Sequence, residues 1–284
     1  MKERTIKIAV WNISGPPKGL HSWGAVSKIN AFQWKIDTLP DIAFYLETPE
    51  GRCECLPGID SDQWEKTFWV GTGQKDNPRG ILAVRYETTK NLKITRVKKV
   101  EGGICIGLEL VYGTQLFQVI GVWAIPPEGK RSGYYFESLK KILRECKSAG
   151  FLKPDIPCIV VGDTNLNLSA RAVSEYILQE GTNECTKNRK DLYSCGLGIK
   201  TDDPSDGKEE VNFRLALFPD EVEQNNPQFS GLMQNTLRKN GKWDRCDLMF
   251  ISDGVKIAKA YLGERGYSDH RPIIFEISVP DENL

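Results

Sequence analysis

The stretch Ser268-Asp269-His270-Arg271-Pro272-Ile273-Ile274-Phe275 places an acid and an imidazole directly before an apolar run. The run predicts a strand, so both polar side chains are expected at the point where that strand begins. His270 is one of two histidines in the chain. An imidazole takes up and releases protons near neutral pH, and a neighbouring carboxylate holds its tautomer or binds a metal ion. Such a pair alone is more typical of a surface turn, so its meaning depends on the ends of the other strands.

Two predicted strands near the start of the chain also end in a polar side chain. Residues 6–11 alternate at a period of two and end at Asn12, before the turn-forming residues 14–17. Residues 41–46 form a nearly continuous apolar run, which is typical of a strand covered on both faces, and Glu47 closes it. Asn12 and Glu47 are therefore expected where their strands meet solvent.

Two strands later in the chain follow the same pattern. A buried strand runs into Gly162-Asp163-Thr164-Asn165, where glycine permits a sharp exit. The side chains of Asp163 and Asn165, two positions apart, are predicted to point to the same side. Asp247 opens another apolar strand, and its side chain is predicted to reach the loop end of the sheet.

Oxygen-bearing side chains of this kind suit a hard divalent cation. Magnesium takes one or two carboxylates together with waters and phosphate oxygens, so Glu47, Asp163 and Asp269 predict a magnesium pocket. The amides of Asn12 and Asn165 orient a carboxylate, or donate to a phosphate without adding negative charge. The chain has no Cys/His spacing of the zinc kind, no Gly-x-x-x-x-Gly-Lys-Ser/Thr loop and no Gly-x-Ser-x-Gly elbow, which argues against those three enzyme classes.

Taken in order, these polar strand ends resemble those of the endonuclease/exonuclease/phosphatase superfamily, which has the DNase-I-like fold. The motifs that carry the resemblance are Trp11-Asn12, Leu46-Glu47, Gly162-Asp163-Thr164-Asn165, Arg245-Cys246-Asp247 and Ser268-Asp269-His270. It covers nearly the whole chain. The resemblance implies a four-layered α/β sandwich, in which helices flank two packed, mostly antiparallel sheets and the site lies at one end. The implied activity is the hydrolysis of phosphate esters with magnesium or manganese.

The resemblance also implies a role for each polar residue. The implied metal ligands are Glu47, Asp269 and Asn12, and the implied catalytic residues are His270, Asp163, Asn165, Asp247 and Asn12. Asp163 would orient or activate the attacking water. His270 would contact the scissile phosphate and assist proton transfer, while Asp247 would hold the imidazole. The two asparagines would bind metal or phosphate.

Trp123 departs from the pattern of the superfamily. In many relatives the strand corresponding to residues 117–122 ends in a His or Tyr that helps to stabilise the transition state or the leaving group. An indole donates one hydrogen bond and is not an acid near neutral pH, so Trp123 is not a general acid. Trp123-Ala124 at this place resembles a bacterial subfamily of the superfamily, and the run Arg79-Gly80-Ile81-Leu82-Ala83-Val84 also fits it. Lys130, Arg131 or a metal-bound water are alternatives for the charge-stabilising group.

Length and composition agree with one sandwich domain over residues 1–284. The chain has 284 residues and 40% hydrophobic content, which is enough for a large core. Apolar spacings of three and four predict helices over about 25–39, 135–146 and 169–177. Residues 181–237 have little periodicity and predict an insertion on the rim of the site.

The chain shows no apolar run of 18 residues, and residues 1–4 do not begin a leader, so we expect a cytoplasmic protein without a membrane span. Its eight cysteines are expected to be reduced thiols in a chain of this length. No pattern in the chain indicates an oligomeric state.

The charges bear on the substrate. The formal net charge is zero, which argues against a protein that coats nucleic acid non-specifically, because Lys and Arg supply most of such binding. The local balance differs, since residues 75–99 hold eight Lys or Arg against two acids, and four more basic residues lie between 238 and 245. If these line one rim, they form a phosphate-binding footprint; solvated strand faces and turns are the alternative.

The sequence therefore predicts a magnesium- or manganese-dependent phosphodiesterase, most specifically a nuclease that hydrolyses DNA or RNA by in-line attack of water. The first alternative is a phosphatase or phosphodiesterase of a small, lipid or inositol phosphate, which the near-neutral charge favours. The second is a degenerate member that binds a phosphorylated ligand or a protein. Trp123 motivates this last reading, and the intact Glu47, Asp163 and His270 argue against it.

Overall fold

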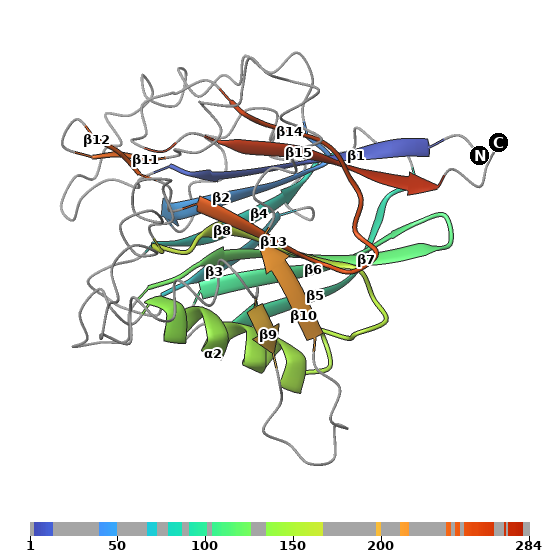
Figure 1. Cartoon of the computed structure of the whole chain (residues 1–284), viewed down its shortest axis with the longest axis horizontal. Coiled ribbons are helices and arrows are strands. Elements are labelled where there is room, and N and C mark those ends of the chain that lie inside the picture. Colours follow the sequence, from blue (N-terminus) through green and yellow to red (C-terminus); the bar gives the residue numbers. More distant parts are fainter. Residues whose placement is uncertain are drawn as a thin grey trace, which may run out of the picture.

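A computed structural model shows two stacked β-sheets with a helix, α2, against the outer face of one of them (Figure 1). It describes residues 3–13, 40–49, 67–72, 79–86, 91–100, 104–125, 135–166, 197–199, 211–215, 237–239, 242–244, 247–263, 270 and 272–280. The predicted fold class, an α/β sandwich of two mostly antiparallel sheets, is confirmed.

The first sheet has six strands and mixes one parallel pair with antiparallel pairs. Its order is β14 (Ile257–Leu262), β15 (Ile273–Pro280), β1 (Glu3–Asn12), β2 (Ile42–Pro49), β4 (Arg79–Arg85) and β3 (Thr67–Gly71). β1 and β2 are parallel, and Asn12 lies opposite Leu46. The parallel register brings the carboxyl ends of both strands to the same edge of the sheet.

The second sheet has seven strands. Its order is β5 (Lys93–Val100), β6 (Ile104–Tyr112), β7 (Gln115–Trp123), β8 (Cys158–Asp163), β13 (Asp247–Ser252), β10 (Val211–Leu215) and β9 (Leu197–Ile199). β9 and β10 come from the segment predicted as a rim insertion, and they extend the edge of this sheet. The short strands β11 (Leu237–Lys239) and β12 (Lys242–Asp244) pair separately.

Helix α2 (Tyr135–Ser148) makes the crossover between the parallel strands β7 and β8 and covers the second sheet. The helix predicted over 135–146 is confirmed, and its apolar residues are buried. It ends at Ser148, and the φ of 64° at Gly150 lets the backbone NH of Phe151 donate to the carbonyl of Cys146. The helices predicted over 25–39 and 169–177 lie outside the described residues. Among the residues described, no helix is long and apolar enough to cross a membrane.

The main core lies between the two sheets. Phe44 and Phe275 of the first sheet and Leu108, Val119 and Val161 of the second are among its fully or almost fully buried members. The Phe44 ring lies so close to Gly121 that a Cβ there would collide with it. Fixing the two sheets at this separation fixes the relative positions of the strand ends.

Three described cysteines are free and buried, as expected of reduced thiols. The Sγ atoms of Cys105 and Cys146 lie 3.6 Å apart between β6 and α2. This hydrogen bond and burial raise the pKa of the Cys105 thiol, and burial raises that of Cys158. All three therefore act as small apolar core residues.

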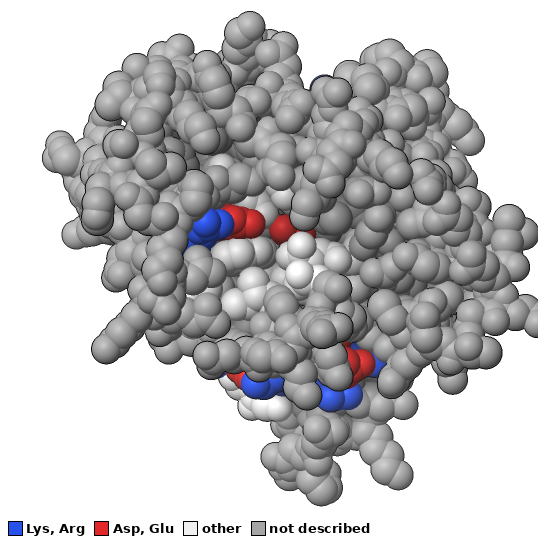
Figure 2. Space-filling model, turned by 90° about the vertical axis from the view of Figure 1, so that its left-hand side faces the viewer, with Lys and Arg blue, Asp and Glu red and all other residues white. Residues whose placement is uncertain are grey.

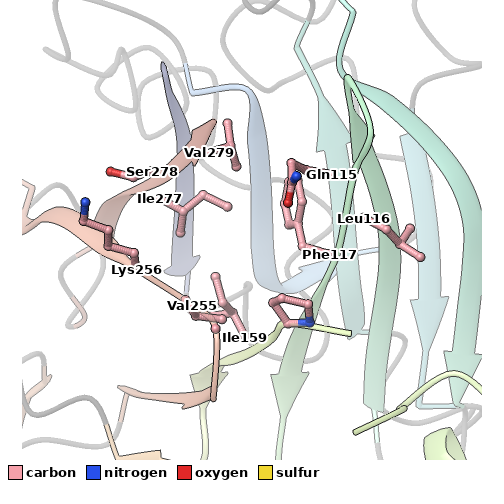
Figure 3. Close-up of a pocket in the computed structure, with 11 residues that line it drawn as sticks. Gln115, Leu116, Phe117, Ile159, Val255, Lys256, Ile277, Ser278 and Val279 are labelled. Carbon is pink, nitrogen blue, oxygen red and sulfur yellow. The ribbon is translucent and has the colours of Figure 1, made fainter. Parts of the chain in front are cut away.

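The two ends of the sandwich differ. Figure 2 looks onto the end where β1, β2 and β8 finish, and shows a basic side chain beside acidic ones in a hollow. At the opposite end the two sheets leave a cavity of about 270 Å³, lined mainly by apolar side chains of β7, β15 and the segment before β14 (Figure 3). The polar residues singled out in the sequence lie at the first of these ends.

Candidate functional site

Five of the seven predicted site residues lie together at one end of the sandwich. They are Asn12, Glu47, Asp163, Asp247 and His270, and hydrogen bonds join them in two groups. Asn165 flanks them, and Asp269 lies outside the described residues. The strand register explains the convergence, because Asp247 at the start of β13 lies directly opposite Asp163 at the end of β8.

Asn12 links the two sheets. Its side chain is fully buried, and its Nδ2 donates to Glu47 Oε1 at 3.0 Å and to Asp163 Oδ2 at 2.8 Å. A buried amide is costly unless it is hydrogen-bonded, so these two bonds are what make Asn12 tolerable in the core. They set one carboxylate from each sheet at a fixed separation.

Glu47 lies in a β-bulge. The strand predicted to close at Glu47 instead continues to Pro49, and its register against β4 shifts between Leu46 and Thr48. Glu47 has a φ of 58°, which is rare for a residue other than glycine and stores strain. Because a bulge turns one side chain away from the alternation of the strand, it directs the Glu47 carboxylate toward Asn12.

Arg79 is a site residue that the sequence analysis did not identify individually. It begins β4, and its guanidinium donates to Glu47 Oε2 at 2.6 Å. The sequence placed Arg79 in a basic stretch and in the run 79–84 that fits a bacterial subfamily, but gave it no role, because the bulge that brings it beside Glu47 depends on strand register. Another basic residue of that stretch, Arg96, donates instead to the carbonyls of Ala149 and Gly150 after α2.

Asp163 ends β8 in a sharp turn. The backbone NH of Asn165 donates to Asp163 Oδ1 at 2.9 Å, and Asn165 has a φ of 53°. This φ takes Asn165 out of the extended conformation on which its predicted direction rested, and its Nδ2 donates to the carbonyl of Ala124 at 3.0 Å. Gly162 has a φ of 149° and lies so close to the Val122 carbonyl that a Cβ there would collide with it. Only glycine fits that position.

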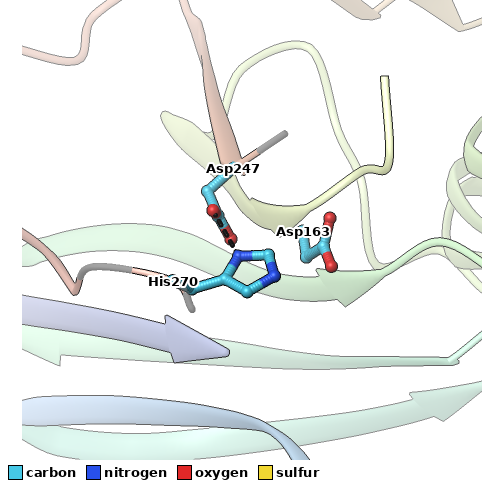
Figure 4. A group of neighbouring side chains, drawn as sticks. All are labelled: Asp163, Asp247 and His270. Carbon is cyan, nitrogen blue, oxygen red and sulfur yellow. Dashed lines mark hydrogen bonds and ion pairs between the residues drawn. The ribbon is translucent and has the colours of Figure 1, made fainter. Parts of the chain in front are cut away.

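Asp247 and His270 form a buried pair. His270 Nδ1 lies 2.8 Å from Asp247 Oδ2, and both side chains are less than a tenth exposed. This contact makes Nδ1 the protonated nitrogen and leaves Nε2 on the side away from Asp247. The imidazole lies between Asp247 and Asp163 (Figure 4), and one ligand atom from each of the three residues falls within 4.8 Å of the others. The Trp11 indole NH donates to the carbonyl of His270 at 3.2 Å.

The pKa of the Asp163 carboxyl is raised from 3.8 to about 7. Burial is the largest cause, and the Asp247 carboxylate adds to it. His270, the backbone NH of Asn165 and the Asn12 amide act in the opposite direction. A carboxyl that changes charge near neutral pH can take a proton from water under ordinary conditions.

The donor set fits a hard divalent cation. Glu47, Asp163 and Asp247 offer carboxylate oxygens, and one guanidinium is bound among them. After burial, the Asp247 carboxylate is the second cause of the raised pKa of Asp163, so these two carboxylates repel each other in the protein alone. A bound cation would remove that repulsion. Of the predicted ligands, Glu47 is partly exposed and accepts a hydrogen bond from the buried Asn12.

Trp123 ends β7 as predicted, directly opposite Asp163 in register. Its side chain is 5% exposed and belongs to the core between the sheets. The indole therefore packs under the site and brings it no charge. Lys130 and Arg131, the predicted alternatives, lie outside the described residues.

No known family model matches the chain, and no curated protein matches its sequence. Solved structures do match its fold. ANGEL2, a 2',3'-cyclic phosphatase in complex with adenosine-2',3'-vanadate, has a TM-score of 0.58 at 13% identity, with 98% of this chain and 96% of that chain covered. A mannosyl-6-phosphatase from Bacteroides thetaiotaomicron has a TM-score of 0.53 at 15% identity, with 96% and 99% covered.

A further match bears the name of the superfamily whose motifs the sequence resembles. An endonuclease/exonuclease/phosphatase family protein from Bacteroides thetaiotaomicron has a TM-score of 0.54 at 14% identity, with 99% of this chain and all of that chain covered. The agreement covers the full length of both chains, although the sequences have diverged widely. The chain therefore has the fold of the endonuclease/exonuclease/phosphatase superfamily, as its five short motifs indicated.

Proposed function

We propose that this protein is a metal-dependent phosphodiesterase, and specifically a nuclease that hydrolyses DNA or RNA. The observation that carries the proposal is the buried group in which Asn12 holds Asp163 at 2.8 Å while Asp247 holds His270 at 2.8 Å. Burying these charges and amides costs stability, and packing alone does not require them. The fold is also that of several phosphoric ester hydrolases, two of which are named above.

The metal would be magnesium or manganese, held by Glu47 and Asn12 and, from outside the described residues, by Asp269. When bound, such an ion polarises a phosphoryl oxygen and offsets the charge that develops in the transition state. Glu47 is suited to this task because its carboxylate lies toward solvent and its position is fixed by the bulge and by Asn12.

The remaining steps belong to the side chains. Asp163, with a pKa of about 7, accepts a proton from the attacking water as the new oxygen–phosphorus bond forms in line with the bond that breaks. Asp247 keeps the imidazole of His270 oriented, and in the doubly protonated ring Nε2–H donates to a phosphoryl oxygen or passes its proton to the leaving oxygen, while Asp163 holds the proton taken from the water. One water is consumed, and the products are a phosphate ester and an alcohol.

A phosphomonoesterase acting on a small sugar or lipid phosphate is the alternative. The mannosyl-6-phosphatase and the 2',3'-cyclic phosphatase match this chain about equally well. The names of these two enzymes give a sugar phosphate and a cyclic phosphate as substrates on the same fold. The zero net charge of the chain also favours a small substrate over a long polyanion.

One experiment separates these functions. Plasmid DNA, single-stranded DNA, RNA, bis-(p-nitrophenyl) phosphate, 2',3'-cyclic AMP and mannose 6-phosphate are each incubated with the protein in Mg²⁺, Mn²⁺ or EDTA. We expect metal-dependent cleavage of the nucleic acids that Glu47→Ala and His270→Ala abolish. Glu276→Ala, which removes a carboxylate from the middle of β15, is the matched control and keeps activity. Turnover of mannose 6-phosphate alone would replace the nuclease by the alternative, and turnover of none would contradict both.

A further inference from the structure

Arg79 and Glu47 form the solvent-facing side of the site. Their side chains are 25% and 17% exposed, whereas Asn12 and Asp163 are almost completely buried. A ligand that enters from solvent therefore meets the guanidinium and the Glu47 carboxylate before it reaches the deeper residues. Figure 2 shows basic and acidic side chains side by side at this end of the sandwich.

The position of Arg79 is fixed by its backbone. The carbonyl of Arg79 accepts a hydrogen bond from the NH of Thr72 at 3.0 Å, which ties β4 to the end of β3. The next residue, Gly80, lies so close to the Val70 carbonyl that a Cβ there would collide with it. The guanidinium therefore extends from a rigid strand and not from a free loop, which is the arrangement that holds a binding group in place.

The charges of the site require a cation on the ligand side. Glu47, Asp163 and Asp247 bring three carboxylates to one end of the sandwich, and they repel a phosphate anion. Trp123, at the place where relatives carry a His or Tyr, packs in the core and supplies no charge. Arg79 brings a fixed positive charge to these carboxylates from β4, the strand beside Glu47 in the first sheet.

We propose that Arg79 binds the substrate, keeping Glu47 Oε2 as its anchor while it donates to a non-bridging phosphoryl oxygen beside the metal. A guanidinium presents its donors in a planar fork, which lets one group bind a carboxylate and a phosphate together. This role rests on the proposed function, because it assumes that a phosphoryl group occupies the site. It gives the site a hydrogen-bond donor on both sides of that phosphoryl group, with Arg79 on one side and His270 on the other.

The competing role is purely local. In it, Arg79 neutralises or orients Glu47 and never contacts substrate. The two roles predict different effects on metal and on phosphate. A residue that only orients Glu47 weakens both when it is removed. If Arg79 contacts phosphate, its removal weakens phosphate binding alone. Metal binding stays unchanged or becomes tighter, because one positive charge beside the metal is gone.

The test measures the two affinities separately in the full chain. Mn²⁺ binding is followed by electron paramagnetic resonance, and binding of inorganic phosphate in saturating Mg²⁺ by calorimetry. The variants are Arg79→Gln, which removes the charge, and Arg79→Lys, which keeps the charge but loses the fork. Arg85→Gln is the matched control, because it removes the same kind of side chain from the other end of β4. Thermal unfolding confirms that each variant is folded.

We expect Arg79→Gln to weaken phosphate binding about 10- to 100-fold, the range of one charge-assisted hydrogen bond. Arg79→Lys should fall between it and the wild type, and Arg85→Gln should match the wild type. Mn²⁺ affinity should not fall in any of them. Parallel loss of Mn²⁺ and phosphate affinity in Arg79→Gln, unchanged phosphate affinity, or no phosphate binding by the wild type would each overturn the proposal. Failure of the proposed function gives a different result. In that case phosphate binding still depends on Arg79, but the protein hydrolyses none of the esters.

Discussion

Two strands, β8 and β15, reach both ends of the sandwich and contribute opposite chemistry to each. At one end, β8 finishes at Asp163 and β15 follows His270, and both side chains are buried and hydrogen-bonded. At the other end the same strands contribute Ile159 and Ile277, which line the apolar cavity (Figure 3). The difference shows that the core supports both ends, while the described group of hydrogen-bonded carboxylates and imidazole lies at only one of them.

The backbone conformation also differs between the polar end and the cavity end. Glu47 and Asn165 both have positive φ values at the polar end, and the bulge at Glu47 turns a carboxylate inward. Such residues cost roughly 1–3 kcal/mol each, and they persist where the surrounding structure holds them. The cavity end carries none of this polar burial among its lining residues. We infer that substitutions at the polar end change activity, and substitutions at the cavity end change stability.

The largest expected effect is the loss of activity in His270→Ala. Removing the imidazole should lower kcat/KM for the cleaved substrate about 1,000-fold, within the range for a general acid or base. The kinetics are measured on the folded fraction, because removing the buried ring also takes a hydrogen bond from the buried Asp247 carboxylate and lowers the melting temperature. Asp247→Asn should lower activity as well, since it disturbs the tautomer of His270. Steady-state kinetics and thermal unfolding are measured for both variants. A kcat/KM near that of the wild type in His270→Ala would contradict the assignment of activity to the polar end.

Gly162→Ala should affect both properties. A methyl group there meets the Val122 carbonyl, and a φ of 149° is strained for any residue with a Cβ. We expect a loss of about 3 kcal/mol in unfolding free energy, measured by urea denaturation, together with lower activity, because Asp163 is the next residue. The control is Gly254→Ala at the cavity end, where the Cβ would meet only the Pro157 side chain. Its φ of 82° makes it destabilising too, but without loss of activity in the folded fraction.

Ile277→Ala should show the reverse of His270→Ala. Ile277 is 4% exposed and borders the cavity, so its truncation enlarges a space that is already there. Large-to-small changes of this kind cost about 2–4 kcal/mol of unfolding free energy. The kcat/KM of the folded protein should remain that of the wild type. A selective loss of activity would show that the two ends are coupled.

The sequence predicted the strand ends well and the backbone of the site poorly. Alternation at a period of two identified β1 and its terminal Asn12, and the apolar runs identified the strands that carry Asp163 and Asp247. These patterns depend on residues that are neighbours in the chain. The bulge at Glu47 depends on how β2 pairs with β4, which lies some thirty residues further along the chain. No local pattern reports such a register.

Arg79 was missed for the same reason. The sequence showed it in a basic stretch and at the start of the run 79–84, and only the paired strands place it beside Glu47. The raised pKa of Asp163 also required the fold, because its causes are burial and the proximity of Asp247, 84 positions later in the chain. Residue types therefore indicated the chemistry, and long-range pairing determined its geometry.

The polar end should also make stability depend on pH. The folded protein keeps a proton on Asp163 up to about pH 7, whereas the unfolded chain releases it near 3.8. Because the folded state binds more protons in this interval, unfolding free energy falls as pH rises from about 4 to 7, by at most about 1.4 kcal/mol per pH unit. Urea denaturation in EDTA measures this slope, and Asp163→Asn should flatten it. Equal slopes in both proteins would assign the dependence to other groups. Added Mg²⁺ should stabilise the wild type at pH 7.5.

The smallest expected effect is a gain at the cavity end. Val255 is half-buried and lines the cavity of about 270 Å³, which has room for another methyl group. Val255→Ile should add about 0.5 kcal/mol of unfolding free energy and raise the melting temperature by about 1–2 °C. Val255→Thr, which keeps the shape but exchanges a methyl for a hydroxyl, should be less stable than the wild type. Because the polar end lies across the core, neither change should alter kcat/KM. If Val255→Ile changed kcat/KM, the sheets would transmit strain from the cavity end to the polar end. The two ends would then not control stability and activity separately.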